Sequence, residues 1–195
     1  MKPFSLNFNY RLVLNFFWYQ TIWFSAILGG EQFEPAIALL IILHLLHSQD
    51  RKAELMTMLP CAAIGISVDS FLSWQGLFLF NPAPELLPIP LWLVGIWFGF
   101  AGILRHSLNY FVSRPALATC AGAVFAPLTY FAAARLGAVS FGLPDSISAL
   151  VIGVVWAIMM AAFSTIYHWV ERHKYSGQPL VLSTINRVPD RQFQE

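Results

Sequence analysis

The sequence has few charged residues and no polar region large enough for a soluble domain. Only 11% of its 195 residues are charged and 57% are hydrophobic, whereas soluble proteins average roughly 25% charged residues. The formal net charge is +1, from 11 Lys and Arg against 10 Asp and Glu. Nucleic-acid binding requires a basic surface, so we expect no nucleic-acid partner. The two cysteines, Cys61 and Cys120, both lie in apolar runs and therefore say nothing about the redox compartment.

Long apolar runs fill most of the chain, and the mean hydropathy is +0.63. A helix needs about 20 apolar residues to cross the hydrocarbon core of a bilayer. The runs therefore predict an all-α fold, a polytopic transmembrane helix bundle of six spans. We place the spans at about residues 11–28, 33–47, 53–71, 91–111, 116–136 and 149–170. They form one domain over residues 1–174, and the polar residues 175–195 are expected to be a flexible cytoplasmic tail.

The distribution of Lys and Arg predicts the orientation of these spans. With six crossings, ten of the basic residues fall on one side and only Arg135 on the other. Cytoplasmic loops collect Lys and Arg, so both termini are expected in the cytoplasm. The ten residues on that side are Lys2, Arg11, Arg51, Lys52, Arg105, Arg114, Arg172, Lys174, Arg187 and Arg191.

Stripes of small residues predict which helix faces meet other helices, because close backbone approach holds membrane helices together. In the fourth span Gly95, Gly99 and Gly102 lead at helical spacing to His106 and Asn109, so His106 is expected to face protein. A similar stripe in the sixth span leads to His168.

Several polar side chains are predicted to lie near the cytoplasmic ends of the spans. Ionisable groups at membrane depth usually face the bundle interior or a water-filled cavity and mark functional sites. His106 and Glu54 are our candidate catalytic acid and base. The candidate binding residues of this cluster are Asn15, His47, Asn109 and His168, and Arg11 and His44 lie at the same depth.

Less specific interpretations of these residues stay open. Histidines at helix ends often anchor in the head-group region, and Glu54 could form a surface ion pair with Arg51 or Lys52. Imidazoles and a carboxylate in one pocket could instead bind a divalent metal. The chain has neither an HExxH nor a GxSxG motif, so the sequence leaves the presence of a metal or other cofactor open.

Asp69 lies deeper in the third span and is a further candidate binding residue. Fifteen residues separate it from Glu54, which is about 22 Å of helix rise. Either it pairs with a polar side chain across the bundle, or it belongs to a proton or cation path.

Three runs carry a family resemblance: LNFNYRLVLNFFWYQ, RKAELMTMLPCAAIGISVDSF and PLWLVGIWFGFAGILRHSLNYF. Over about residues 7–170 the chain resembles a bacterial family of small multi-pass inner-membrane proteins known as a domain of unknown function. The most specific matches are Trp97, Phe100-Ala101, His106-Ser107-Leu108, Glu54 and Asp69. The resemblance implies no particular activity. It implies a bacterial inner-membrane location and, because such genes often neighbour lipid-modifying enzymes, it implies membrane lipids and soluble lipid-modifying enzymes as partners.

Three hypotheses about function follow. The first is a role in fatty-acyl or phospholipid modification, as an enzyme or as an accessory protein, through the polar pocket near the cytoplasmic face. The second is a small transporter or permeation protein that uses Asp69 and the polar cluster. The third is a structural or assembly role in the membrane.

Overall fold

The computed structural model of the chain, described here for residues 10–175, is mostly helical. The expected tail lies outside the described residues except for Tyr175. The elements are α1 (Tyr10–Gly29), the 3-10 helix η1 (Gly30–Phe33), α2 (Glu34–His47), α3 (Arg51–Trp74), β1 (Phe78–Leu79), α4 (Leu91–Ala101), α5 (Asn109–Val112), α6 (Pro115–Arg135), β2 (Ser140–Phe141) and α7 (Asp145–Tyr175).

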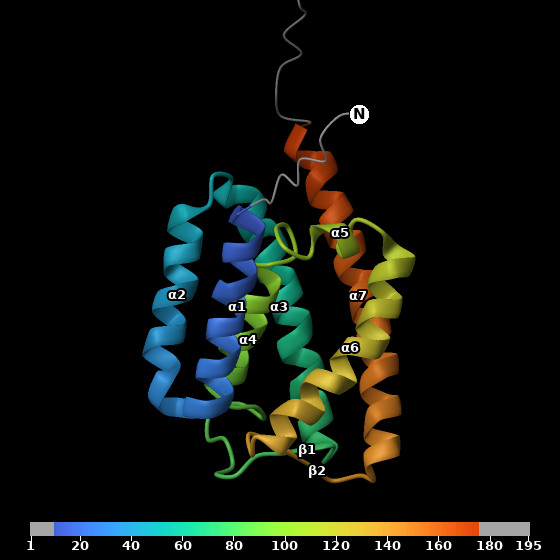
Figure 1. Cartoon of the computed structure of the whole chain (residues 1–195). Coiled ribbons are helices and arrows are strands. Elements are labelled where there is room, and N and C mark those ends of the chain that lie inside the picture. The colour runs from blue at the N-terminus through green and yellow to red at the C-terminus, as the bar shows by residue number, and fades with distance from the viewer. Residues whose placement is uncertain (1–9, 176–195) are drawn as a thin grey trace, which may run out of the picture.

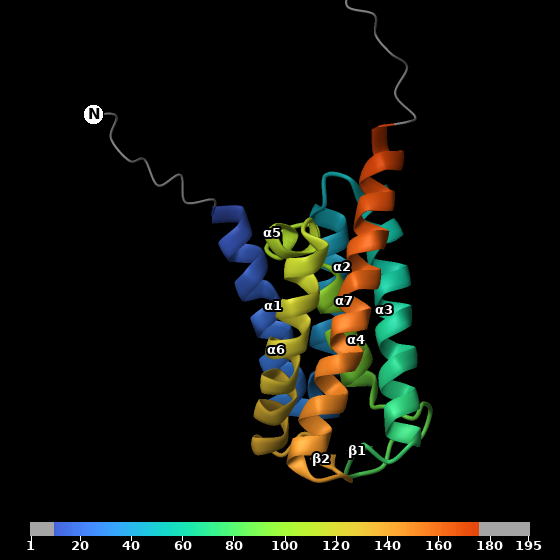
Figure 2. The same cartoon turned by 90° about the vertical axis from the view of Figure 1, so that its right-hand side faces the viewer.

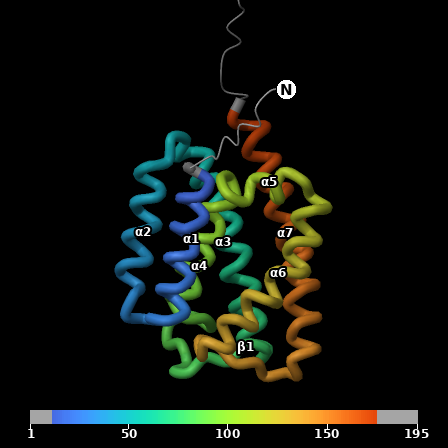
Figure 3. Tube along the Cα trace, viewed as in Figure 1, coloured from blue at the N-terminus to red at the C-terminus, as the bar shows by residue number. Residues whose placement is uncertain are grey.

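The long helices run up and down the length of one bundle (Figures 1 and 3). The end where α1 begins and α7 ends also carries α5, and we call it the α5 end. The opposite end, the ribbon end, carries β1 and β2, which pair antiparallel with Phe78 opposite Phe141. This short ribbon was not part of the all-α expectation. It forms because the loops after α3 and α6 meet there, and their backbone groups need hydrogen-bond partners.

Four helical stretches are long and apolar enough to cross a membrane: Leu12–His47, Arg51–Trp74, Pro115–Arg135 and Asp145–Lys174. The first turns back through η1, so that α1 and α2 form a hairpin (Figure 1). α4 is apolar but has only 11 residues. Large apolar side chains, among them Leu14, Leu150 and Ile158, are exposed on the outside of the bundle. These features indicate a membrane protein.

The fourth apolar run is not the single helix over residues 91–111 that its hydropathy suggests. α4 ends at Ala101, and residues 102–108 form successive turns, which we call the 102–108 turn. The backbone N–H of Ser107 donates to the Asn15 side chain at 3.2 Å instead of to a helical carbonyl. A side chain that satisfies a backbone donor competes with the helix. Asn15 of α1 therefore stabilises the break in the helix after Ala101.

α3 and α4 approach each other closely where Gly65 faces Trp97. A Cβ atom on Gly65 would lie 2.1–2.4 Å from three ring carbons of Trp97. Only glycine leaves this space, and the ring that fills it is almost fully buried. α6 and α7 meet in a similar way, since a Cβ on Gly122 would lie 2.7 Å from the carbonyl oxygen of Trp156.

Gly65→Ala is therefore expected to destabilise the bundle by roughly 1–3 kcal/mol, the usual range for overpacking a well-packed site. The measurement is the midpoint of thermal unfolding in detergent, followed by helical circular dichroism. Ala63→Leu is the matched control, because it adds a larger group at an exposed position of the same helix. Equal midpoints for Gly65→Ala and wild type would contradict this packing.

Candidate functional site

Two histidine side chains from separate elements meet the carboxylate of Glu54 at the α5 end. His44 Nε2 lies 2.9 Å from Glu54 Oε1, and His106 Nε2 lies 3.2 Å from Oε2. An ionised carboxylate only accepts hydrogen bonds, so each imidazole donates to a different oxygen. Glu54 is only 1% exposed, which means that these contacts replace its hydration.

The local structure of α2 and α3 holds two of these side chains in place. The Asp50 side chain accepts the backbone N–H of Ala53 at 3.2 Å and so caps α3. Glu54 then falls in the first helical turn, where the helix dipole favours a negative charge. His44 lies in the last turn of α2, and its ring stacks on Trp18 with centroids 4.4 Å apart.

The 102–108 turn brings in His106. Asn15 accepts hydrogen bonds from both the backbone N–H and the hydroxyl of Ser107, the latter at 2.8 Å. Gly102 begins the turn beside His44, where a Cβ atom would lie 3.3 Å from Nε2 of that histidine. The close approach keeps the turn against α2 and places the two imidazole rings 5.5 Å apart, edge to face.

Arg105 extends the cluster to α7. Its Nη2 atom donates to Glu171 Oε1 at 2.7 Å, and its Nη1 atom lies 3.9 Å from Glu54 Oε2. The guanidinium is buried, and its Nε atom has no hydrogen-bond partner among residues 10–175. Arg105 thus links α3 to α7 and adds a positive charge beside the carboxylate.

The candidate residues from the sequence lie in different surroundings in the structure. It brings Glu54 and His106 together, with Asn15 one residue away through Ser107. Asn109 is exposed and accepts a hydrogen bond from the Tyr167 hydroxyl at 2.8 Å.

The other two candidates of the cluster are His47 and His168. Within residues 10–175, neither forms a hydrogen bond with Glu54 as His106 does. His47 is the last residue of α2 and is exposed. His168 is half-buried on α7, with its ring centroid 5.4 Å from that of Tyr167 and its Nδ1 atom unpartnered among the described residues.

Asp69 forms a separate buried site about four turns further along α3. Trp97 Nε1 donates to Oδ2 at 2.8 Å, and the Tyr130 hydroxyl lies 2.7 Å from Oδ2 and 2.9 Å from Oδ1. The Trp97 ring stacks on Trp156 of α7. Asp69 therefore joins α3, α4 and α6 and has a polar partner across the bundle.

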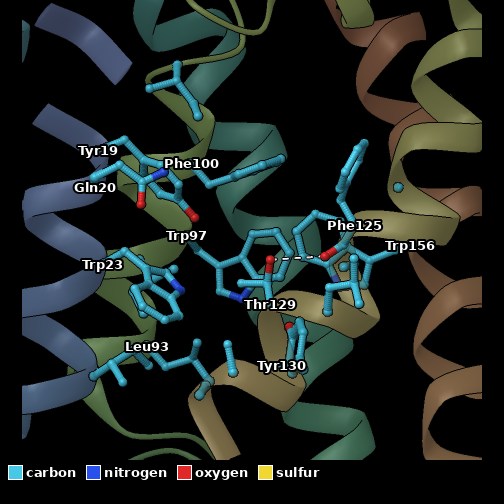
Figure 4. A pocket seen from close by; sticks show the side chains of 18 of the residues that line it. Tyr19, Gln20, Trp23, Leu93, Trp97, Phe100, Phe125, Thr129, Tyr130 and Trp156 are labelled. Atoms are coloured by element: carbon cyan, nitrogen blue, oxygen red, sulfur yellow. Dashed lines mark hydrogen bonds between the residues drawn. The ribbon is translucent and has the colours of Figure 1, made fainter. Parts of the chain in front are cut away.

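A cavity of about 560 Å³ lies between α1, α4, α6 and α7. Figure 4 shows aromatic rings from these helices pointing into it, with Trp97 and Tyr130 in its wall. Its polar lining includes Gln20 and Thr129. Three lining side chains on α1 and α6, Phe16, Phe125 and Leu128, are also 45%, 60% and 62% exposed. The cavity therefore opens sideways between α1 and α6 onto the apolar outer surface. In Figure 2, α6 stands in front of α1.

Sequence reasoning missed several of these residues. Arg105 entered only the charge count for topology, although the rule that buried charges mark sites applies to it as well. Trp97 and Tyr130 are 28 and 61 residues from Asp69 in the chain, and no spacing rule connects them. The Asp50 cap has a recognisable signal, an Asp directly before a helix.

The Asp50 cap makes a prediction about pH. The hydrogen bond from the Ala53 N–H, and then the nearby Lys174, hold the pKa of Asp50 below its ordinary value of 3.8. A lowered pKa in the folded state stabilises the fold above the unfolded pKa, and this contribution is lost as the pH falls through the folded pKa. Asp50→Ala should cost about 1 kcal/mol near neutral pH and less below about pH 4, measured by thermal unfolding.

Asp50→Asn is the control for this prediction, because an asparagine side chain also caps a helix but does not titrate. The gap between Asp50→Asn and Asp50→Ala should stay constant with pH. A gap between wild type and Asp50→Ala that does not shrink in acid would contradict the assigned role.

Comparison with known proteins agrees with the sequence resemblance. A family model described as Protein of unknown function (DUF2878) matches residues 12–162. No curated protein and no solved structure matches the chain. The family match spans most of the chain, including Glu54, Asp69 and His106, and the chain belongs to this family of proteins of unknown function.

Proposed function

We propose that the protein crosses a bacterial inner membrane six times, with the α5 end on the cytoplasmic side. The six crossings are α1, α2, α3, α4 with the 102–108 turn, α6 and α7. Seven basic residues of the described chain lie in segments at the α5 end and Arg135 lies at the ribbon end, a bias that favours this orientation. The seven are Arg11, Arg51, Lys52, Arg105, Arg114, Arg172 and Lys174.

In this orientation the protein binds the acyl part of a membrane lipid in the cavity between α1 and α6. The observation that carries the proposal is the sideways opening of this cavity onto the apolar surface. Its volume of about 560 Å³ falls within the range of roughly 300–1,000 Å³ for ligand pockets. An apolar chain can enter from the bilayer without crossing water, and aromatic walls bury it.

The 102–108 turn connects the cavity with the polar cluster. Ile103 and Leu108 line the cavity, and Arg105 and His106 lie between them in the chain. A lipid whose chain occupies the cavity would therefore have its polar end near the α5 end. There His106 and Glu54 act as acid and base, or hold the head group for a soluble lipid-modifying enzyme. Asn15 and Asn109 lie at the same end and orient the head group.

The first test compares the lipids of a strain that lacks the gene with strains complemented by wild type or by His106→Ala. Wild type is expected to restore an altered acyl or head-group profile, and His106→Ala is expected not to, because it removes one proton-transfer group beside Glu54. His173→Ala is the control, since it removes an exposed histidine of α7 at the same end of the bundle. An identical profile with and without the gene would overturn the lipid proposal.

A second pair of variants tests the cavity in the same experiment. Ala121→Trp fills space, because Ala121 lines the cavity. Cys120→Trp adds the same ring at the neighbouring exposed position. Ala121→Trp should abolish restoration of the lipid profile and Cys120→Trp should preserve it. Crosslinking of a photoactivatable fatty acid to the purified protein should follow the same order.

The transport alternative has one observation in its favour, the buried carboxylate of Asp69 behind the cavity wall. If Asp69 is a station for protons or cations, Asp69→Asn should stop ion flux into vesicles that hold the purified protein, because an amide cannot carry the charge. Flux of protons, followed with a pH-sensitive dye, and of potassium would be measured. Wild-type vesicles no more permeable than empty ones would exclude this alternative. Both Asp69 oxygens already have donors, which favours the lipid proposal.

A further inference from the structure

We propose that His44, Glu54 and His106 bind a divalent transition-metal ion. One nitrogen from each histidine and one carboxylate oxygen all lie within 4.8 Å of one another. Ligands at the usual 2.0–2.2 Å from a tetrahedral zinc ion are roughly 3.3–3.6 Å apart. The longest of these separations would have to shorten by at most about 1.5 Å for the three donors to reach bonding distance of one ion. This inference goes beyond the lipid proposal, because it rests on the cluster itself and not on the cavity.

The donors are held for a common centre. Both histidines present Nε2 to Glu54, at 2.9 and 3.2 Å. In the tautomer that carries its proton on Nδ1, Nε2 of a neutral imidazole is a frequent metal ligand. The Trp18 ring fixes the plane of His44 by stacking on it. The Ser107 contacts with Asn15 fix the turn that carries His106. The contacts that support the donors thus come from α1, which is not itself a source of ligands.

The charge around the site also favours a cation. With neutral imidazoles, the carboxylates of Glu54 and Glu171 and the guanidinium of Arg105 sum to one negative charge. Arg105 lies closer to Glu171, at 2.7 Å, than to Glu54, at 3.9 Å. Its positive charge therefore compensates mainly the carboxylate of Glu171. A buried carboxylate is stable only when it is paired or bound to a metal, and a divalent ion would neutralise Glu54 directly.

The donor types select the class of metal. Two imidazoles and one carboxylate form the three-ligand set of catalytic zinc sites and of non-haem ferrous sites, both of which keep an open position. Calcium and magnesium prefer oxygen ligands, so two histidines argue against them. An ion in this place would polarise a carbonyl or phosphoryl oxygen, or activate a water molecule, at the depth of lipid head groups.

The test measures metal binding by the full chain, purified in detergent through a tag without histidine and stripped with a chelator. After equilibration with Zn²⁺ or, under anaerobic conditions, Fe²⁺, and removal of free ion, wild type should retain about one ion per chain. Bound Co²⁺ should give visible absorption bands typical of imidazole and carboxylate ligands. Glu54→Gln and His106→Gln should each weaken binding at least about 100-fold, the upper end of the effect of losing an outer-shell contact.

His173→Gln is the matched control, because it removes an exposed imidazole at the same end of the bundle; it should bind as wild type does. If Glu54→Gln fails to give a monodisperse protein, His44→Gln takes its place in the comparison. Less than about a tenth of an ion per wild-type chain would overturn the metal site, and so would equal binding by wild type and His106→Gln. A protein without metal that still restores the lipid profile would leave the lipid proposal standing, so the two can fail separately.

Discussion

A carboxylate buried among apolar helices needs hydrogen-bond donors or a cation, and Glu54 imposes this requirement on the whole α5 end. It is only 1% exposed, so water cannot supply what it needs. The donors come from the end of α2 and from the 102–108 turn, and Arg105 carries the network on to Glu171 in α7. A single charged side chain in the first turn of α3 thus determines how α2, the 102–108 turn and α7 meet.

The same requirement applies to Asp69, a second buried carboxylate on α3. Trp97 and Tyr130 satisfy Asp69 with an indole N–H and a hydroxyl, and both rings also line the cavity. Neutral donors suit a structural site in an apolar environment, because they satisfy the oxygens without adding a second charge. Glu54 instead has two imidazoles, which can bind metals and transfer protons. The chemistry of the donors therefore separates a site that holds helices together from one that can act on a ligand.

The end of the bundle at which Glu54 and His106 lie was predictable from the sequence, but their contacts were not. Apolar runs and basic residues predicted a membrane bundle and a polar cluster at one end, and four helices have the length and composition to cross a membrane. The glycine stripe of the fourth run led to the expectation that His106 faces protein. His106 does contact Glu54, yet through a turn rather than a helix, because Asn15 takes the Ser107 N–H. Such a long-range hydrogen bond leaves no periodic signal, and the same holds for the pair of Arg105 and Glu171, 66 residues apart.

The shape of the cavity is the reason for proposing a membrane lipid rather than a water-soluble substrate. A path for ions or polar solutes needs polar groups along its length, because an ion or polar group without a partner in an apolar environment costs several kcal/mol. Here aromatic and aliphatic side chains form most of the wall, and the rim on α1 and α6 consists of exposed apolar residues. The ligand that meets such an opening first is the one already dissolved in the bilayer. In this proposal the polar cluster at the α5 end would lie near the head group of the lipid, beside a turn whose own residues line the cavity.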